Sequence, residues 1–432
     1  MPSKDLPSLL EKLGGDIAAN VKTLSVALRD VEQPALSFAA DSPVYVLPSN
    51  APAAAHESRA AISEACTELF QLVSGPSELL PNFMANYQTI FAFQWLLHFE
   101  ILPLIPPEGS ISYTAVAEAA KVPESQLKSV ARMVMTSKVL CETADKELAH
   151  SAASAMFLKI PNMLDWARFM CRASIPTAAN MIQATERWPE SAQKTETAYN
   201  IAFKHELPFF AHLSQDPTLN QQFSGYMKSV TGGEGTDLTH LVNGFPWGEL
   251  ADGCSVIDVG GSTGHGTFAL ASAYPGLRFE VQDLPEVTKN GLGLLEKHPE
   301  SLATRVQFRS HDFFQPQPVE GASVYLLRMI LHDWADADAI KILSNIVSSM
   351  SASSVILLMD TVLPDPGAVP AIQERALRVR DLTMRQVFNS KERTLDDWTS
   401  LLSLVDGRLY LSSVTQPPGS HMSLMTVSLR ST

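Results

Sequence analysis

A glycine-rich turn between an aliphatic run and a helix-like stretch constrains the fold of this chain more than any other feature. Residues 256–270 read VIDVGGSTGHGTFAL, so four glycines follow an acidic residue within seven positions. Glycine lets the backbone turn tightly and lie close against a ligand, and the helix that follows presents free amide N–H groups to that ligand. The pattern is typical of the first strand, loop and helix of a doubly wound α/β sheet.

The rest of the C-terminal half alternates between strand and helix patterns. Apolar runs predict strands within residues 254–260, 277–284, 306–313, 322–330 and 353–363, and helices of ordinary length separate most of them. Such alternation favours a parallel sheet with helices on both faces. We therefore predict a doubly wound, mostly parallel Rossmann-like sheet over about 236–432, in a catalytic domain that starts with helices at 166.

The N-terminal half has helical periodicity. Apolar spacing predicts an amphipathic helix at 5–31, then a Pro/Ala/Ser linker at 42–58 and two helices at 57–75 and 83–101. The last of these is apolar around most of its circumference, which requires burial in a core or against a second subunit. We favour the subunit interface.

Residues 110–160 have the outline of a winged helix, with two helices, a turn and a short polar hairpin. DNA binding is one use of that outline. The second helix, however, offers only Lys128, Arg132 and Lys138, with Glu124 in the turn before it, and the chain has a formal net charge of -14. Because phosphate binding needs a concentrated basic face, we predict an all-helical dimerisation domain with a winged helix over 1–165, a homodimer, and no nucleic-acid partner.

Composition and cysteine spacing indicate the compartment. The four cysteines lie far apart without a CxxC pair, which favours reduced thiols over disulfides or zinc. The N-terminus lacks the unbroken apolar segment of a secretory signal, and no stretch reaches the roughly 18 apolar residues of a membrane span. We expect a cytoplasmic protein that binds no membrane.

Acidic residues stand at the ends of three predicted strands. Asp258 closes the first strand, and Asp283 closes the second, where an acid usually accepts hydrogen bonds from ribose hydroxyls. Asp312 and Phe313 follow the third strand, and an acid beside an aromatic ring suits an adenine. No Lys or Arg lies near the glycine loop, so the site is poorly suited to a pyrophosphate. It fits a nucleoside without phosphates that carries positive charge.

S-adenosylmethionine (SAM) meets that description, and the chain resembles the class I SAM-dependent O-methyltransferases. Within that family it most resembles the plant caffeate/flavonoid type and its fungal secondary-metabolism branch. The resemblance covers the whole chain and rests on five segments in order: VIDVGGSTGHGTFALASAYPGLRFEVQDLPEV, HDFF, LLRMILHDWADADAIKIL, MDTVLP and DLTMRQVFNSKERT.

The resemblance implies a cofactor role for residues at the strand ends and in the loop. The methionine part of SAM would be framed by Asp258, Gly260, Gly261 and Gly264. The ribose would meet Asp283 and Leu284, and the adenine Asp312 and Phe313. Arg328 stands where the family commonly has a Lys near the cofactor, a change that keeps the charge but alters the geometry.

The resemblance also places the catalytic base at His332, in LRMILHDWAD, after an apolar strand. An imidazole is the usual base near neutral pH, and such a base needs an orienting carboxylate. The two family positions for that carboxylate hold Asp360 and Glu392. Asp360 is one methylene shorter than the Glu of many plant relatives. Glu392 has an alternative interpretation, pairing with Arg393 or Lys391 on the surface.

Apolar and small polar residues are candidates for the substrate pocket: Thr231, Trp334, Met384 and Phe388. Met384 and Phe388 lie one helical turn apart, although such spacing is equally typical of a hydrophobic core. We expect Asp333, Asp336 and Asp338 to cap a helix and place negative charge at its N-terminus rather than bind a metal, for which we predict no site. His265 and His311 are expected to make local hydrogen bonds.

Together these residues predict methyl transfer from SAM to a hydroxyl of a polyketide or phenolic secondary metabolite. The alternative is a protein that binds SAM without consuming it and acts as a dehydratase or pericyclase on a polyketide-derived intermediate, as a few fungal relatives do. The two reactions differ in whether SAM becomes S-adenosylhomocysteine (SAH). A winged-helix regulator and a catalytically silent SAM-binding protein are further alternatives.

Overall fold

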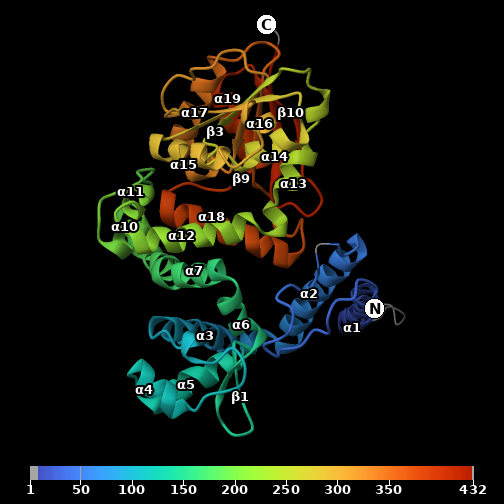
Figure 1. Cartoon of the computed structure of the whole chain (residues 1–432), viewed down its shortest axis with the longest axis vertical. Helices are drawn as coiled ribbons and strands as arrows, with labels where there is room; N and C mark the ends of the chain where they lie inside the picture. The colour runs from blue at the N-terminus through green and yellow to red at the C-terminus, as the bar shows by residue number, and fades with distance from the viewer. Residues whose placement is uncertain (1–7, 49, 431–432) are drawn as a thin grey trace, which may run out of the picture. The chain divides into compact units, whose positions relative to one another are not determined.

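The structure is a computed structural model that describes residues 8–48 and 50–430 (Figure 1). The chain forms two compact units. The first contains the residues up to Cys171 together with the short segments Gln221–Tyr226 and Pro370–Ile372. The second contains the remainder. None of the helices in the described part of the chain combines the length and the apolar character that crossing a membrane requires.

The first unit is mainly helical. Its first two helices, α1 (Leu9–Asp30) and α2 (Ala53–Ser74), pack against one another. A capping box between Ser8 and Glu11 begins α1; residues 5–7 of the predicted helix lie outside the described residues. The predicted linker is too long at its end, because α2 already starts at Ala53. Alanine has the highest helix propensity, and the run of three alanines after Pro52 forms the first turn.

The third helix, α3 (Leu79–His98), is buried only near its C-terminal end, at Leu96 and Leu97. Large apolar side chains along the rest of the helix are exposed in the single chain: Leu79, Leu80, Phe83, Met84, Tyr87, Ile90 and Phe91. A patch of this kind on a folded chain usually marks an interaction surface.

Helices α4 (Tyr113–Ala120) and α5 (Glu124–Met135) precede an antiparallel pair of short strands, β1 (Leu140–Glu142) and β2 (Leu148–His150). The fully buried residues Val116, Leu127 and Leu148 join these elements into one small core. Helices α6 (Ala152–Lys159) and α7 (Pro161–Phe169) follow, so the end of the predicted polar hairpin is helical.

The second unit begins with short helices and continues into a seven-stranded sheet. The helices are α8 (Ile175–Ala179), α9 (Met181–Arg187), α10 (Ala198–Phe203), α11 (Phe209–Leu213), α12 (Pro217–Thr231), whose residues 221–226 belong to the first unit, and α13 (Leu238–Gly244). The strand order is β10-β11-β7-β6-β3-β4-β5. The five predicted strands are confirmed as the parallel part: β3 (Ser255–Val259), β4 (Arg278–Asp283), β5 (Val306–Ser310), β6 (Val324–Arg328) and β7 (Val355–Asp360).

Two further strands make the sheet mixed. Strands β10 (Leu409–Thr415) and β11 (Ser423–Leu429) pair antiparallel, and β11 pairs antiparallel with β7. The main covering helices are α14 (His265–Ala273), α15 (Pro285–Leu295), α17 (Asp336–Val347) and α19 (Leu395–Val405), and α18 (Ala371–Phe388) lies between β8 and α19 in the chain. Along β6, Tyr325 and Leu327 face one buried core while Val324 and Leu326 face the other. Burial of both faces explains why β6 and β7 are almost continuously apolar.

The direction of the chain reverses at β3. From β3 the chain adds β4 and β5 on one side, and then returns to add β6 and β7 on the other. Ligands of open α/β sheets bind at the carboxyl ends of the strands beside such a reversal. At this edge lie Gly260 after β3, Asp283 in β4, Arg328 in β6 and Asp360 in β7.

Candidate active site

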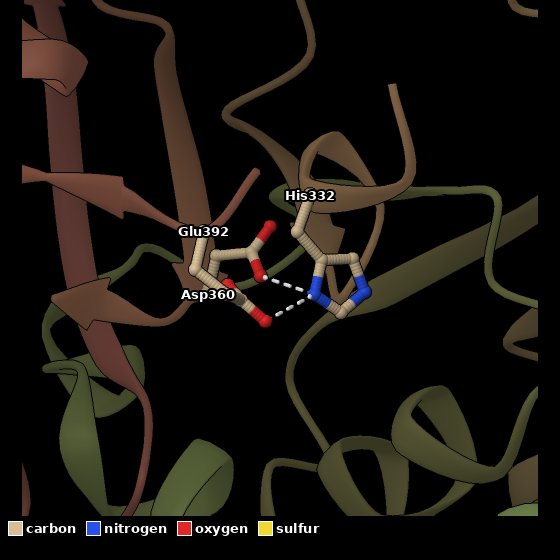
Figure 2. A group of neighbouring side chains, drawn as sticks. All are labelled: His332, Asp360 and Glu392. Atoms are coloured by element: carbon tan, nitrogen blue, oxygen red, sulfur yellow. Dashed lines mark hydrogen bonds and ion pairs between the residues drawn. The ribbon is translucent and has the colours of Figure 1, made fainter. Parts of the chain in front are cut away.

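A histidine and two buried carboxylates meet at the carboxyl edge of the sheet (Figure 2). His332 lies in the short 3-10 helix η6 (Leu331–Asp333) after β6. Its Nδ1 is 3.1 Å from Oε1 of Glu392 and 3.4 Å from Oδ1 of Asp360. All three side chains are almost completely buried. The structure thus brings together the three residues that the sequence singled out for catalysis.

Local backbone pairing holds the two carboxylates side by side. Asp360 ends β7 and is followed by β8 (Val362–Leu363), which pairs in parallel with β9 (Arg393–Thr394) directly after Glu392. The backbone N–H of Glu392 also donates to Oδ1 of Asp381, at 3.0 Å. Asp360 therefore reaches the histidine ring despite its shorter side chain.

Arg393 fixes the histidine turn to the segment that contains Glu392. Its buried guanidinium donates to the carbonyl oxygens of Leu331 at 2.7 Å and Trp334 at 2.8 Å, and also to Asp336. Lys391 pairs with Asp397 at 2.6 Å. The alternative in which Glu392 pairs on the surface with Lys391 or Arg393 is therefore wrong, because both cations bind other partners and Glu392 is buried.

The neighbouring carboxylates determine the protonation state of His332. Burial by itself would lower the pKa of His332, but the carboxylates of Asp360, Asp333 and Glu392 outweigh it and raise the pKa to about 10. Burial raises the pKa of Asp360. Burial also opposes ionisation of Glu392, yet the neighbouring His332 holds the pKa of Glu392 below its usual value. A positive charge on the ring is therefore strongly stabilised here.

The two ring nitrogens of His332 have different surroundings. Nδ1 faces the two carboxylates and is suited to keep its proton, whereas Nε2 lies 3.6 Å from Oδ1 of Asp333. Burial raises the pKa of Asp333 to about 6. When the ring is neutral, an imidazole whose Nδ1–H is held by carboxylates accepts a proton at Nε2, so His332 in its neutral form can act as a general base.

The acidic residues after His332 divide between two surroundings. Asp336 and Asp338 lie in the first turn of α17, where negative charge is favourable. The N-cap of α17 is Ala335, so the expectation that these acids cap the helix is wrong. A separate set, His332, Asp360 and Glu392, has ligand atoms within 4.8 Å of one another and has the chemistry to hold a metal ion.

The glycine loop passes directly over the carboxylate of Asp258. A Cβ on Gly261 would lie 2.5 Å from Cγ of Asp258, and Gly260 and Gly264 have φ angles of +73° and +86°. Asp258 accepts a hydrogen bond of 2.7 Å from the Thr267 hydroxyl, and burial raises its pKa to about 6. The loop thus lies against a buried acid that a bound cation would stabilise in its charged form.

Asp283 and Leu284 support the same loop from the end of β4. The Asp283 carboxylate accepts from the backbone N–H of Ser262 at 2.9 Å and of Leu284 at 2.7 Å, and the Leu284 side chain is exposed. Both oxygens keep further lone pairs for a ligand hydroxyl. Asp312 is exposed after β5 and accepts from the N–H of Phe314 at 3.0 Å.

The Trp334 indole packs with Phe313 and Phe314, at ring distances of 5.4 and 4.7 Å. Its ring contacts therefore lie beside the residues expected at the adenine. Phe388 is buried against Phe209 and Phe210, at 5.3 and 5.7 Å.

Met384 is partly buried on the helix that ends with Phe388. The Thr231 hydroxyl donates to the Met227 carbonyl within α12, at 2.7 Å. His265 makes the expected local contact with Thr263, at 2.9 Å, whereas Nε2 of His311 is buried without a hydrogen-bond partner among the described residues.

The inference that no Lys or Arg lies near the glycine loop is wrong, because Arg328 ends the strand next to β3. Strand β6 adjoins β3, so the charge of Arg328 reaches Asp258 and offsets part of the rise in its pKa that burial causes. Nη2 of Arg328 donates to the Thr236 carbonyl at 2.7 Å, whereas its buried Nε has no partner in the described chain. An inward N–H without a partner suits a ligand with an acceptor oxygen.

Two further residues near the site were missed in the sequence. The ammonium group of Lys194 lies over the Trp334 ring and 3.8 Å from Asp338, and burial lowers its pKa to about 8. Arg380 lies one turn before Met384 on α18 and has a buried Nη1 without a partner among the described residues. The spacing of 380, 384 and 388 at every fourth position was the available signal.

Comparison with known proteins adds the family. Residues 189–405 match the family described as O-methyltransferase domain. The chain is 56% identical over 438 residues to O-methyltransferase aurJ of Gibberella zeae, with 100% of both chains covered.

Solved structures share the fold at low sequence identity. The crystal structure of OxaC in complex with SAH and oxaline has a TM-score of 0.71 and 22% identity, over 97% of this chain and 100% of that one. A protein described as a pericyclic reaction enzyme has a TM-score of 0.70 and 22% identity, over 96% and 99%.

Proposed function

The chain belongs to the O-methyltransferase family and takes SAM as its cofactor, and from that premise we propose that it methylates a hydroxyl of a phenolic or polyketide secondary metabolite with His332 as general base. One observation carries the proposal. Nδ1 of the buried His332 lies 3.1 and 3.4 Å from two buried carboxylates, at the carboxyl edge of the sheet. A reaction that removes a hydroxyl proton needs a base oriented in this way.

The loop and the strand ends suit SAM. In this proposal the buried Asp258 and the close backbone of Gly260, Gly261 and Gly264 hold the methionine part, with Arg328 beside them. Asp283 accepts from the ribose next to Leu284, and Asp312 with Phe313 meets the adenine. When bound, SAM supplies an electrophilic methyl group on a positively charged sulfur. A carboxylate-lined site stabilises such a cation.

The protein's own part in the chemistry is positioning and proton transfer. In this reaction the neutral His332 would accept the proton of the substrate hydroxyl at Nε2 as that oxygen bonds to the methyl group, and the methyl–sulfur bond would break to release SAH. The ring becomes a cation, and Glu392 and Asp360 stabilise it from the opposite nitrogen. Arg393 holds the turn that contains His332 next to Glu392, because its guanidinium donates to the carbonyls of Leu331 and Trp334.

A phenolic or polyketide substrate would need an apolar pocket beside His332. We assign it to Thr231, Met384 and Phe388, with Trp334 at the border toward the adenine end. Phe388 packs against Phe209 and Phe210, and the exposed ring of Phe210 is suited to a planar substrate ring. The similarity to aurJ, itself an O-methyltransferase, agrees with a hydroxyl acceptor.

The proposal includes a homodimer through the region 1–165, with a winged helix at 110–160, and a catalytic domain over 166–432. The large apolar side chains exposed along α3 support it, because a second copy would cover them. Phe83→Asp should convert the dimer to a monomer in light scattering after gel filtration. Gln126→Asp, at an exposed position of α5, is the matched control. A wild-type monomer at micromolar concentration would contradict this part of the proposal.

His332→Gln tests the central assignment. Loss of a general base should lower kcat by about 10²- to 10⁴-fold, while the Kd for SAM, measured by calorimetry, stays within a few-fold of wild type. His98→Gln, at an exposed histidine of α3, is the control and should change neither quantity. A His332→Gln variant with kcat close to wild type would remove His332 from the mechanism.

A further inference from the structure

Helix α18 carries four arginines, and three of them, Arg375, Arg378 and Arg380, have contrasting partners. Arg378 is satisfied, since its guanidinium donates to Glu374 at 3.0 Å and to the Pro364 carbonyl at 2.8 Å. Arg375 is exposed. Arg380 differs from both, because its Nη1 is buried and has no hydrogen-bond partner in the described chain.

The charge of Arg380 acts on the catalytic group. It favours the ionised forms of Asp360, whose pKa burial nevertheless raises, and of Glu392, and it adds to the lowering of the pKa of Arg328 that burial causes. Among the ion pairs of the described residues, Arg393 is paired with Asp336 at 2.7 Å, whereas neither Arg328 nor Arg380 pairs with a carboxylate within 4.0 Å. Two guanidinium groups whose charges interact thus both keep a buried N–H without a partner among the described residues.

A buried donor without an acceptor is costly, and a charged one more so. Natural proteins tolerate this where a ligand supplies the acceptor. Arg380 also lies on the same helix face as Met384 and Phe388, at successive four-residue intervals. An anionic or carbonyl oxygen of a ligand seated against these residues would meet Nη1.

We infer that Arg380 binds an oxygen substituent of the substrate, a carboxylate or a ketone carbonyl next to the hydroxyl that is methylated. This inference rests on the proposed function and narrows its substrate class to hydroxyaryl acids and hydroxyaryl ketones. The guanidinium donates to that oxygen and so holds the neighbouring hydroxyl toward His332. Arg380 is then a specificity residue that touches the substrate, separate from the base.

The test compares ligand pairs by calorimetry in the presence of SAH, without turnover. The probes are hydroxynaphthoic acid with its carboxylate next to the hydroxyl, the matching acetylnaphthol, and unsubstituted naphthol. Wild type should bind the acid about 10- to 100-fold more tightly than naphthol, as expected for a charge-assisted hydrogen bond, with the ketone between them. Arg380→Gln should reduce this ratio to near one, and Arg380→Lys should restore part of it. The control Arg375→Gln should leave it unchanged.

Three results would overturn the inference. The first is a wild type without preference for the acid over naphthol, including no binding of either at millimolar concentration. The second is an Arg380→Gln variant that binds all three probes equally more weakly, as for a residue that only balances the charge of Asp360 and Glu392. The third is an Arg380→Gln variant that binds SAH more weakly while preserving the ratio, which would assign the oxygen partner to the cofactor. Because no methyl transfer is measured, failure of this test is distinct from failure of His332 as the base.

Discussion

Replacing Glu392 by Gln should change the pKa of His332 by a predictable amount. The change removes one carboxylate at 3.1 Å from Nδ1, while the amide oxygen of Gln still accepts the hydrogen bond. A hydrogen bond to a charged group contributes about 1.5–3 kcal/mol, and one pKa unit corresponds to about 1.4 kcal/mol. The pKa of His332 should therefore fall from about 10 by about one to two units.

The assay is an NMR titration of ¹³C-labelled histidine rings in the whole protein. Spectra of His332→Gln identify the His332 signal by its loss. Glu296→Gln, an exposed carboxylate at the end of α15, is the control and should leave the His332 titration unchanged. An unchanged pKa of His332 in Glu392→Gln would refute the reasoning that this carboxylate holds the ring charged.

Glu392→Gln should also change the pH dependence of kcat/KM and of the free energy of unfolding, each in a defined direction. The rising limb of kcat/KM against pH should move to lower pH, and the plateau should fall because the imidazolium is less stabilised. In the wild type, the raised pKa of His332 contributes stability that is complete below about pH 6.5 and is lost as pH rises through about 10. Glu392→Gln should thus be destabilised at neutral pH, and this difference should disappear at high pH.

Three further outcomes are expected. Gly261→Ala should weaken SAH binding at least about 10-fold, because the new Cβ would lie 2.5 Å from Cγ of Asp258. Gly248→Ala is the control and should bind SAH normally, because a Cβ there would meet only Tyr274, at 4.0 Å. Equal SAH affinities of the two variants in calorimetry would contradict the close approach of Gly261 to Asp258. Asp258→Asn should weaken SAH binding, yet it should raise the Tm of the free protein more at pH 8 than at pH 5. The pKa of Asp258 is about 6 in the folded protein against an ordinary value of 3.8, so its ionisation lowers the free energy of unfolding by about 3 kcal/mol where the carboxyl is charged in both the folded and the unfolded state. A Tm gain independent of pH would argue against a buried charge. Removing divalent metals with EDTA should leave methyl transfer unchanged, and activity lost to EDTA and restored by one metal would mean that His332, Asp360 and Glu392 bind an ion.

Much of the fold was predictable because its strands are buried on both faces. Apolar runs predicted β3, β6 and β7 directly, and the regular alternation with helices predicted the more polar β4 and β5. The antiparallel strands β10 and β11 were missed. β10 is mostly exposed and rich in serine and threonine, so its pattern of polar and apolar residues resembles a loop. β11 is buried at most positions, yet serine and threonine interrupt its apolar residues and it pairs antiparallel rather than following a helix of the alternating pattern.

The catalytic group was predictable only through its resemblance to a family. Periodicity does not bring together Asp360 and Glu392, which meet because β8 pairs with β9. The environment of charges was not predictable, since Arg328 reaches Asp258 across strands that are distant in sequence. Arg380 was missed because an arginine in an amphipathic helix usually faces solvent, and its lack of a partner is a tertiary property.

The most direct test of the account follows the methyl group itself. Wild-type protein and His332→Gln are incubated with SAM that carries a deuterated methyl group and with hydroxynaphthoic acid or another hydroxyaryl acceptor, and the products are measured by mass spectrometry. The account predicts one labelled methyl group on oxygen for each SAH formed by the wild type, and at least about 100-fold less label with His332→Gln. A substrate that is rearranged or dehydrated without label, while SAM remains intact, would contradict it.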